Sequence, residues 1–183
     1  IMALGVGGCG GNIISNIADS GVNGIELVSL NTDSQEQNII HKSKKIKIGE
    51  GHGAGNNPDT ANKIAQDSED IIRKIFDEKP EVLFLTAGMG GGTGTGATPV
   101  VARIAKELEI LTIALVTTPF ESEGGRKTDQ AQQGIDTLIN YVDCLIEIPN
   151  QKIYEISTEK IGNTSAAYKL LNDEIKKIIK EIS

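Results

Sequence analysis

The chain has 183 residues, 38% of them hydrophobic, and a formal net charge of −7. Its length suits one folded domain with a real core, whereas the negative charge and an aromatic content of 3% disfavour nucleic acid or an anionic membrane as the main partner. No stretch has the roughly 18 apolar residues of a membrane span. The two cysteines fit neither a disulfide framework nor a Cys-x-x-Cys metal site. We therefore expect a cytoplasmic protein without a metal site of its own.

Strand-like and helical patterns alternate along the chain. Apolar runs predict strands at residues 1–6, 25–30, 82–86, 111–116 and 144–148, and a short edge strand at residues 45–48. Amphipathic patterns predict helices at residues 12–20, 58–76, 99–108, 127–139 and 165–182. This alternation predicts an α/β fold with a doubly wound, mainly parallel sheet, helices on both faces and right-handed crossovers.

Local patterns refine this outline. Asn57 is the expected N-cap of the helix at residues 58–76, with Pro58 at its first position. The lysines within residues 42–47 predict a solvated strand edge. The last helix carries an apolar stripe that includes Ile179 and is expected to pack on the sheet. The predicted apolar face of the helix at residues 58–76 consists of Ala61, Ile64, Ala65, Ser68, Ile71, Ile72, Ile75 and Phe76.

Two glycine-rich stretches, residues 5–12 (GVGGCGGN) and residues 88–96 (GMGGGTGTG), each follow a strand-like run and precede a helical pattern. Glycine has no Cβ, so backbone N–H groups can approach phosphate oxygens, and a helix N-terminus adds the positive end of its dipole. The ends of other predicted strands carry residues 31–33, residues 121–127 and Asn150. Because ligands sit beyond the carboxyl ends of parallel strands, we expect all these segments to meet at one nucleotide site.

A dinucleotide-binding domain of the NAD type is the main alternative. Residues 5–10 fit Gly-x-Gly-x-x-Gly, and Asp33 follows the second strand at a distance suited to a ribose. That fold gives no reason for a second phosphate-type loop at residues 88–96, and no Walker-type loop occurs in the chain. The alternative stays open on these residues alone.

Residues 85–97 (LTAGMGGGTGTGA) resemble the signature loop of the tubulin/FtsZ family, in its FtsZ form. Segments that match the family pattern in order are residues 5–12, 31–33, 53–58, 118–124 and 148–150. The resemblance covers essentially the whole chain. It implies a Rossmann-like domain, residues 1–164, that binds GTP or GDP, and a long helix, residues 165–183, that completes the site. It also implies a GTPase that polymerises head to tail for cell division, with Mg²⁺ expected beside GTP.

The resemblance also implies roles for single residues. Residues 8–12 would hold the α- and β-phosphates, and residues 92–94 would wrap the phosphate tail, with the Cys9 side chain a bystander. Glu123 would accept the ribose hydroxyls, Asn150 would meet the sugar or base edge, and Asp173 would read guanine by accepting two hydrogen bonds. The expected nucleotide-binding residues are Gly7, Gly8, Cys9, Gly10, Gly11, Asn12, Asp33, Ala54, Gly55, Gly88, Gly90, Gly91, Gly92, Thr93, Gly94, Thr95, Gly96, Pro119, Glu123, Lys127, Asn150, Tyr168, Asn172 and Asp173.

The sequence departs from the family pattern at several points. Lys127 stands where the family usually has arginine, with Arg126 one place early, which puts bidentate recognition there in question. Tyr168 stands where a phenylalanine commonly stacks on the base. The family carries an acidic catalytic loop and a second domain after the long helix, and the 183 residues contain neither. We therefore assign no catalytic residue and expect hydrolysis to be completed in trans. A nucleotide-dependent assembly regulator without catalysis remains an alternative.

Overall fold

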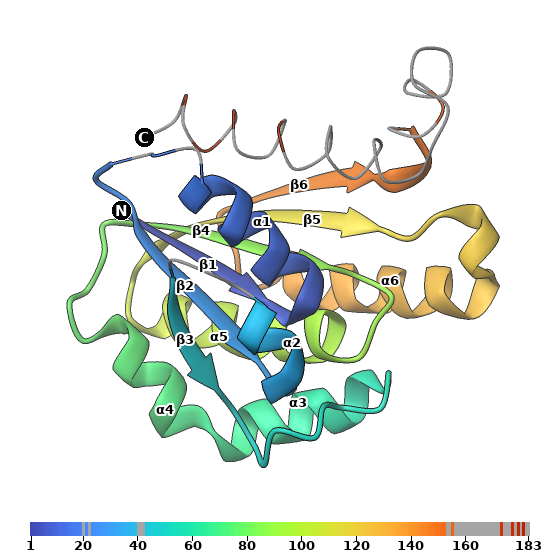
Figure 1. Cartoon of the computed structure of the whole chain (residues 1–183), viewed down its shortest axis with the longest axis horizontal. Coiled ribbons are helices and arrows are strands. Elements are labelled where there is room, and N and C mark those ends of the chain that lie inside the picture. Colours follow the sequence, from blue (N-terminus) through green and yellow to red (C-terminus); the bar gives the residue numbers. More distant parts are fainter. Residues whose placement is uncertain are drawn as a thin grey trace.

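Parallel strands form the centre of the molecule, in a computed structural model that describes residues 1–19, 21, 23–39, 43–152, 155, 173, 177, 179 and 181. The strands are β1 (Met2–Val6), β2 (Glu26–Asn31), β3 (Lys44–Lys47), β4 (Val82–Gly88), β5 (Leu111–Thr118) and β6 (Cys144–Pro149). They form one parallel sheet in the order β3-β2-β1-β4-β5-β6 (Figure 1). The order reverses between β1 and β4, which confirms the doubly wound sheet predicted from the sequence. At the β3 edge, Lys44, Lys45 and Lys47 are exposed, as expected for a solvated strand edge.

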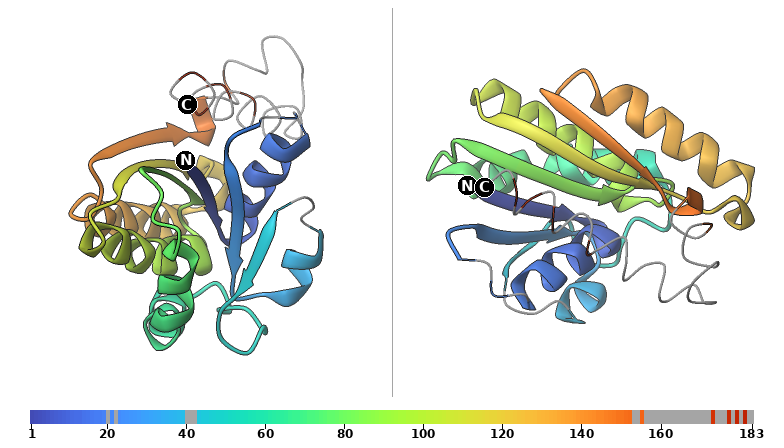
Figure 2. Two further views of the ribbon diagram at one scale, coloured as in Figure 1. Left: turned by 90° about the vertical axis from the view of Figure 1, so that its left-hand side faces the viewer. Right: turned by 90° about the horizontal axis from the view of Figure 1, so that it is seen from above.

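Helices cover both faces of this sheet (Figure 2). One face carries α3, α4, α5 and α6, and the other carries α1. In the described residues, none of the helices is long and apolar enough to cross a lipid bilayer. The helices are α1 (Gly7–Asp19), α2 (Ser34–Ile39), α3 (Pro58–Asp67), α4 (Glu69–Arg73), α5 (Thr93–Glu107) and α6 (Gly125–Leu138), with short 3₁₀ turns η1 (Lys74–Phe76) and η2 (Glu121–Glu123).

The apolar core has two layers because successive strand residues point to opposite faces. Leu4 and Leu85 belong to the larger cluster beneath α3 to α6, whereas Ala3 and Phe84 belong to the cluster beneath α1. Ile179 joins the second cluster and is almost fully buried. This confirms, at that residue, that the C-terminal segment packs on the sheet. Most of residues 165–183 lie outside the described part of the chain, so the predicted division at residue 164 stays a prediction.

The helix predicted at residues 58–76 is correct at its start and wrong in its length. Asn57 caps it, because its Oδ1 atom accepts hydrogen bonds from Asp59 N (2.9 Å) and Thr60 N (3.3 Å). The helix ends at Asp67, since Ser68 has a non-helical backbone (φ −105°, ψ 18°), and α4 and η1 follow as separate turns. The break changes which side chains face the sheet. Ile71, predicted on the buried face, is therefore 44% exposed.

Both glycine stretches are partly helical, which the sequence did not predict. Helix α1 begins at Gly7 rather than at residue 12, and α5 begins at Thr93 rather than at residue 99. Glycines usually indicate a loop, but here the first helical turns lie directly against the strand ends. Pro99 consequently lies inside α5 instead of at its start. The short helix α2 was also not predicted.

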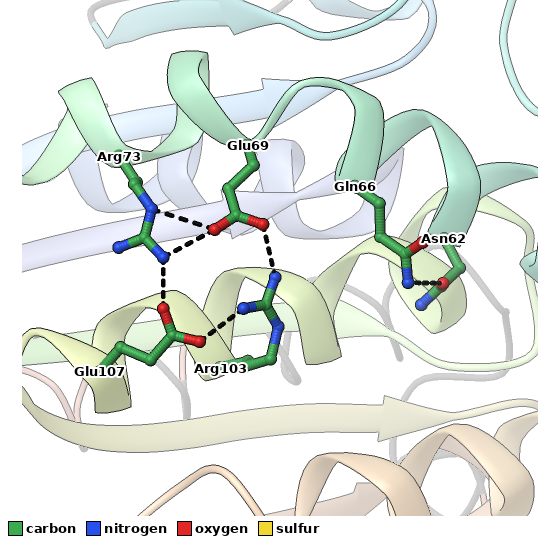
Figure 3. A network of polar contacts seen from close by, with 6 residues as sticks. All are labelled: Asn62, Gln66, Glu69, Arg73, Arg103 and Glu107. Atoms are coloured by element: carbon green, nitrogen blue, oxygen red, sulfur yellow. Dashed lines mark hydrogen bonds and ion pairs between the residues drawn. The ribbon is translucent and has the colours of Figure 1, made fainter.

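A closed ring of four charged side chains ties α4 to α5 (Figure 3). Glu69 accepts from Arg73 Nε (3.0 Å) and from Arg103 Nη2 (2.7 Å). Glu107 completes the ring by accepting from both arginines. Hydrogen bonds from Arg103 and Arg73 lower the pKa of Glu69, and the hydrogen bond from Arg73 lowers the pKa of Glu107. The ring therefore stabilises the folded chain while both carboxyl groups are ionised.

We expect the double variant Glu69→Gln/Glu107→Gln to lose less of its unfolding free energy than the wild type as the pH falls from about 7 to about 3. A lowered folded-state pKa contributes stability above the unfolded-state value, and this contribution is lost as the pH falls through the lowered value. Urea unfolding followed by circular dichroism at several pH values measures the difference.

Glu78→Gln/Glu81→Gln is the matched control, because both carboxylates are exposed and lie outside the ring. The control should keep the acid dependence of the wild type. Equal acid sensitivity of the ring variant and the wild type would show that the ring contributes nothing.

Candidate functional site

A cavity of about 510 Å³ opens at the carboxyl ends of the strands, and we call it the sheet-edge cavity. Its volume lies within the usual range of small-molecule sites. Its walls come from segments far apart in the sequence: both glycine stretches, the start of α2, the loop before α3, the region around η2, and Asn150. The expected meeting of these segments at one edge of the sheet is confirmed.

Most of the residues predicted to bind nucleotide line this cavity. They are Gly7, Gly8, Cys9, Asp33, Ala54, Gly55, Gly88, Gly91, Gly92, Thr93, Gly94, Pro119, Glu123, Lys127 and Asn150. Seven others are described by the structure but do not line it: Gly10, Gly11, Asn12, Gly90, Thr95, Gly96 and Asp173. Tyr168 and Asn172 lie outside the described residues.

Seven further lining residues were not among the expected nucleotide-binding residues, although four of them lie within the segments singled out from the sequence. The seven are Val6, Glu36, His52, Gly53, Asn56, Met89 and Thr117. Thr117 could have been found, because β5 continues two residues beyond the predicted strand end and brings it to the sheet edge. Glu36 could not, because it lies on the unpredicted helix α2. His52 is exposed and also lines the cavity.

The two glycine stretches touch each other at the floor of the cavity. Gly7 has a left-handed backbone (φ 73°), and a Cβ added to it would lie 3.1 Å from Gly94 N. A Cβ added to Gly94 would lie only 2.2 Å from Gly88 O. The close approach of Gly7 to Gly94 brings the N-termini of α1 and α5 side by side, and the missing side chain of Gly88 leaves room for the Cys9 side chain. Their unpaired N–H groups and positive dipole ends favour an anion there.

Some of the glycines serve packing instead of the cavity. A Cβ on Gly10 would lie 2.5 Å from Thr86 O, and a Cβ on Gly96 would lie 2.0 Å from Pro58 O. These glycines let α1 pack closely on β4 and let α5 pack closely on α3. Gly91 is different, because the nearest atom to a Cβ there would be Asn56 Oδ1 at 3.8 Å.

The loop after β2 is held by hydrogen bonds beside the second glycine stretch. The hydroxyl groups of Thr32 and Thr93 lie 2.7 Å apart. Asp33 Oδ1 accepts from Gln35 N (2.8 Å) and from Glu36 N (3.3 Å), so this carboxylate caps α2. Thr93, which was expected to contact phosphate, therefore has a protein partner that holds its side chain at the edge of the cavity.

Glu123 and Lys127 form an ion pair at the other end of the cavity. Lys127 Nζ lies 2.8 Å from Glu123 Oε2, and Phe120 N donates to Glu123 Oε1 (2.9 Å). Partial burial of the carboxyl opposes ionisation, but the hydrogen bonds from Lys127 and Phe120 outweigh it and lower the pKa of Glu123. Lys127, which replaces the usual arginine of the family, thus fixes the neighbouring carboxylate.

Cys9 adds a protonated thiol to the cavity, and Asn150 adds a hydrogen-bond acceptor without a partner in the described residues. Burial raises the pKa of the Cys9 thiol, whose Sγ lies 3.7 Å from Thr117 Oγ1, so it stays protonated at neutral pH. Asn150 Oδ1 is buried and finds no hydrogen-bond partner within the described part of the chain. An orphaned acceptor on a cavity wall indicates a missing donor from water or a ligand.

The family model described as "Tubulin/FtsZ family, GTPase domain" matches residues 1–158. The cell division protein FtsZ of Coxiella burnetii is 45% identical over 165 residues, which is 88% of this chain and 42% of that protein.

Solved structures are also similar to this chain. The empty FtsZ dimer of M. jannaschii superposes with a TM-score of 0.90 at 36% identity, over 98% of this chain and 52% of that one. CetZ2 from Haloferax volcanii, solved as a GTPγS-bound protofilament, has a TM-score of 0.84 at 21% identity, over 99% of this chain and 57% of that one, and shows the fold alone. The chain spans about half the length of the relatives it matches.

We expect Gly96→Ala to lower the free energy of unfolding by about 1–3 kcal/mol, because its methyl group would overlap Pro58 O. Gly91→Ala is the matched control within the same stretch and should leave the stability within about 0.5 kcal/mol of the wild type. Urea titration of the three proteins measures both values. Equal stability of the two variants would refute the division between packing glycines and cavity glycines.

Proposed function

Because the chain belongs to the tubulin/FtsZ family, we propose that it binds GTP and GDP in the sheet-edge cavity and acts as the GTPase domain of a filament-forming cell division protein. One observation carries the proposal. Two glycine stretches, each opening a helix, meet at a single cavity, where a Cβ added to Gly7 of the first stretch would lie only 3.1 Å from Gly94 N of the second. Such a floor suits a chain of phosphates more than any neutral ligand.

The phosphate tail is assigned to the floor of the cavity. Gly8, Gly91 and Gly92 offer backbone approach without a Cβ, and Thr93 adds a hydroxyl group. Residues 10–12 of the first stretch belong to α1 and contribute to the site through the helix dipole. This assignment needs no lysine of the Walker type.

The sugar and base are assigned to the opposite end. Glu123, held ionised by Lys127, is placed to accept ribose hydroxyl groups, and the unsatisfied Asn150 Oδ1 can accept a donor from the sugar or base. Asp173 is helical and exposed, and we assign guanine recognition to it. Tyr168 and Asn172 remain proposed neighbours of the base.

Mg²⁺ fits the site only together with the nucleotide. The described residues include no group of three or more His, Cys, Asp or Glu side chains that could hold a metal ion. Mg²⁺ in phosphate sites needs only one or two carboxylates besides phosphate oxygens and water. Asp33 and Glu36 are such carboxylates, and both line the cavity. When bound, the ion would neutralise phosphate charge.

The remaining parts of the proposal concern assembly and location. We place the protein in filaments that grow head to tail, supported by solved relatives described as a dimer and a protofilament. A cytoplasmic location is supported by the two cysteines, both of them free thiols. The dinucleotide alternative has less support, because the Asp33 carboxylate that would bind a ribose caps α2.

We expect calorimetric titration to show tighter binding of GTP and GDP than of ATP or NAD. Asp173→Asn should reduce the preference for GTP over ATP by about tenfold to a hundredfold. The carboxylate can accept two hydrogen bonds from guanine, whereas the amide can accept only one and turns its NH₂ group toward the other guanine donor. Glu181→Gln, an exposed acidic position in the same segment, is the control and should keep the preference. Equal affinity for ATP, or tighter binding of NAD, would favour the dinucleotide alternative.

We also expect the 183-residue chain to bind GTP but to release phosphate at least about a hundredfold more slowly than the 1 to 1,000 turnovers per second typical of enzymes. Hydrolysis needs a positioned water besides charge stabilisation. The carboxylates that line the cavity, Asp33, Glu36 and Glu123, already accept hydrogen bonds from the protein.

A phosphate-release assay at high protein concentration measures this rate. Addition of a family protein that carries the acidic loop but cannot bind GTP should raise it. Fast release that does not depend on protein concentration would overturn the in-trans proposal and assign catalysis to this chain alone.

A further inference from the structure

Glu36 brings a carboxylate against the first glycine stretch, where the proposed function places phosphates. It lies in the first turn of α2 and lines the sheet-edge cavity. A Cβ added to Gly8 would lie 2.8 Å from Glu36 Oε2 and 3.2 Å from its Cδ. The carboxylate therefore lies next to the backbone that is expected to approach the phosphate chain most closely.

The position of the Glu36 carboxylate is fixed by a hydrogen bond from Asn31. Asn31 Nδ2 donates to Glu36 Oε2 (3.1 Å), and Asn31 itself is 1% exposed. Asn31 Oδ1 in turn accepts from Asp33 N (3.2 Å). A buried amide with both ends engaged orients the carboxylate toward the cavity, so its placement is not that of a free surface side chain.

The charges around the cavity make this carboxylate unfavourable for a bare polyphosphate. Asp33, Glu36 and Glu123 line the cavity, and Lys127 is the only lysine or arginine among the described residues that does so. Lys127 is paired with Glu123, at the end assigned to the sugar. Near Gly8, a phosphate chain would thus meet the Glu36 carboxylate and, among the described residues, no cationic side chain, and like charges at this range repel strongly.

A second feature shows that the same cavity is built for a ligand. Asn150 Oδ1 lies on its wall, more than nine-tenths buried and without a partner in the described chain. A nucleotide that arrives with a divalent cation meets both conditions, since the cation offsets the acidic lining and the sugar or base supplies a donor to Asn150. A divalent cation takes carboxylate and phosphate oxygens as ligands together.

We propose that Glu36 is a specificity-determining residue that selects cation-bound GTP and rejects the free nucleotide. The inference rests on the proposed function, since it assumes that the phosphates occupy the floor beside Gly8. Asp33 is also a carboxylate that lines the cavity, but it caps α2. Its substitution would disturb the helix and is therefore not a clean test of cation selection. Glu36→Gln keeps the shape and the acceptor for Asn31 while it removes the charge.

The test is GTP binding to the 183-residue chain, measured by calorimetry in Mg²⁺ and again in EDTA. The wild type should bind at least about tenfold more tightly in Mg²⁺ than in EDTA. In Glu36→Gln this ratio should fall toward one, because affinity in EDTA rises while affinity in Mg²⁺ falls. A variant that merely damaged the site would lose affinity under both conditions, which would overturn the proposal.

Glu50→Gln is the matched control. Glu50 is an exposed carboxylate on the loop after β3 and lines a separate cavity of about 320 Å³. It should keep the wild-type ratio. Guanosine, which has no phosphates, should bind equally to all three proteins with or without Mg²⁺.

Each remaining outcome decides between the two claims. Wild-type binding that is equal in Mg²⁺ and EDTA, or an unchanged ratio in Glu36→Gln, would overturn the role of Glu36 and leave GTP binding intact. Failure of the wild type to bind GTP in Mg²⁺ would overturn the proposed function and this inference with it.

Discussion

The parallel pairing of β1 with β4 is the constraint on which the site depends. These strands are far apart in the chain, but their register aligns Val6 with Ala87, so the two strands end within one residue of each other. The strand order reverses here, and each strand is followed directly by a glycine stretch. The turn after β4 is tight, because a Cβ on Gly94 would lie 2.2 Å from Gly88 O, and the two turns approach each other closely, because a Cβ on Gly7 would lie 3.1 Å from Gly94 N. Two helix N-termini consequently lie side by side, with the Cys9 side chain packed against Gly88.

This constraint also explains why glycine is so frequent around the site. One group of glycines permits close packing of helices: Gly10 lets α1 lie close to β4, and Gly96 lets α5 lie close to α3. Another group leaves open space at the cavity, as at Gly91. Both groups occur within the same few residues. A substitution in this region can therefore destabilise the fold or weaken ligand binding, and the distances around each glycine predict which effect occurs.

Much of the fold follows from local sequence signals, and the failures have physical causes. Strands such as β4 were predicted because an uninterrupted apolar run requires burial on both faces. Asn57 was predicted as a cap because its side chain acts within three residues. The break at Ser68 was missed because no glycine or proline marks it in the sequence. Glu36 was missed because no apolar period marks a helix as short as α2.

Asn150 Oδ1, a buried acceptor without a donor in the described part of the chain, lowers the stability of the ligand-free protein. Such an acceptor costs about 1–3 kcal/mol, and relief of this cost is part of the binding free energy of any ligand that supplies the donor. Occupancy and resistance to unfolding are then linked by mass action. In a cell that degrades unfolded chains, the lifetime of this protein would increase with the concentration of its ligand.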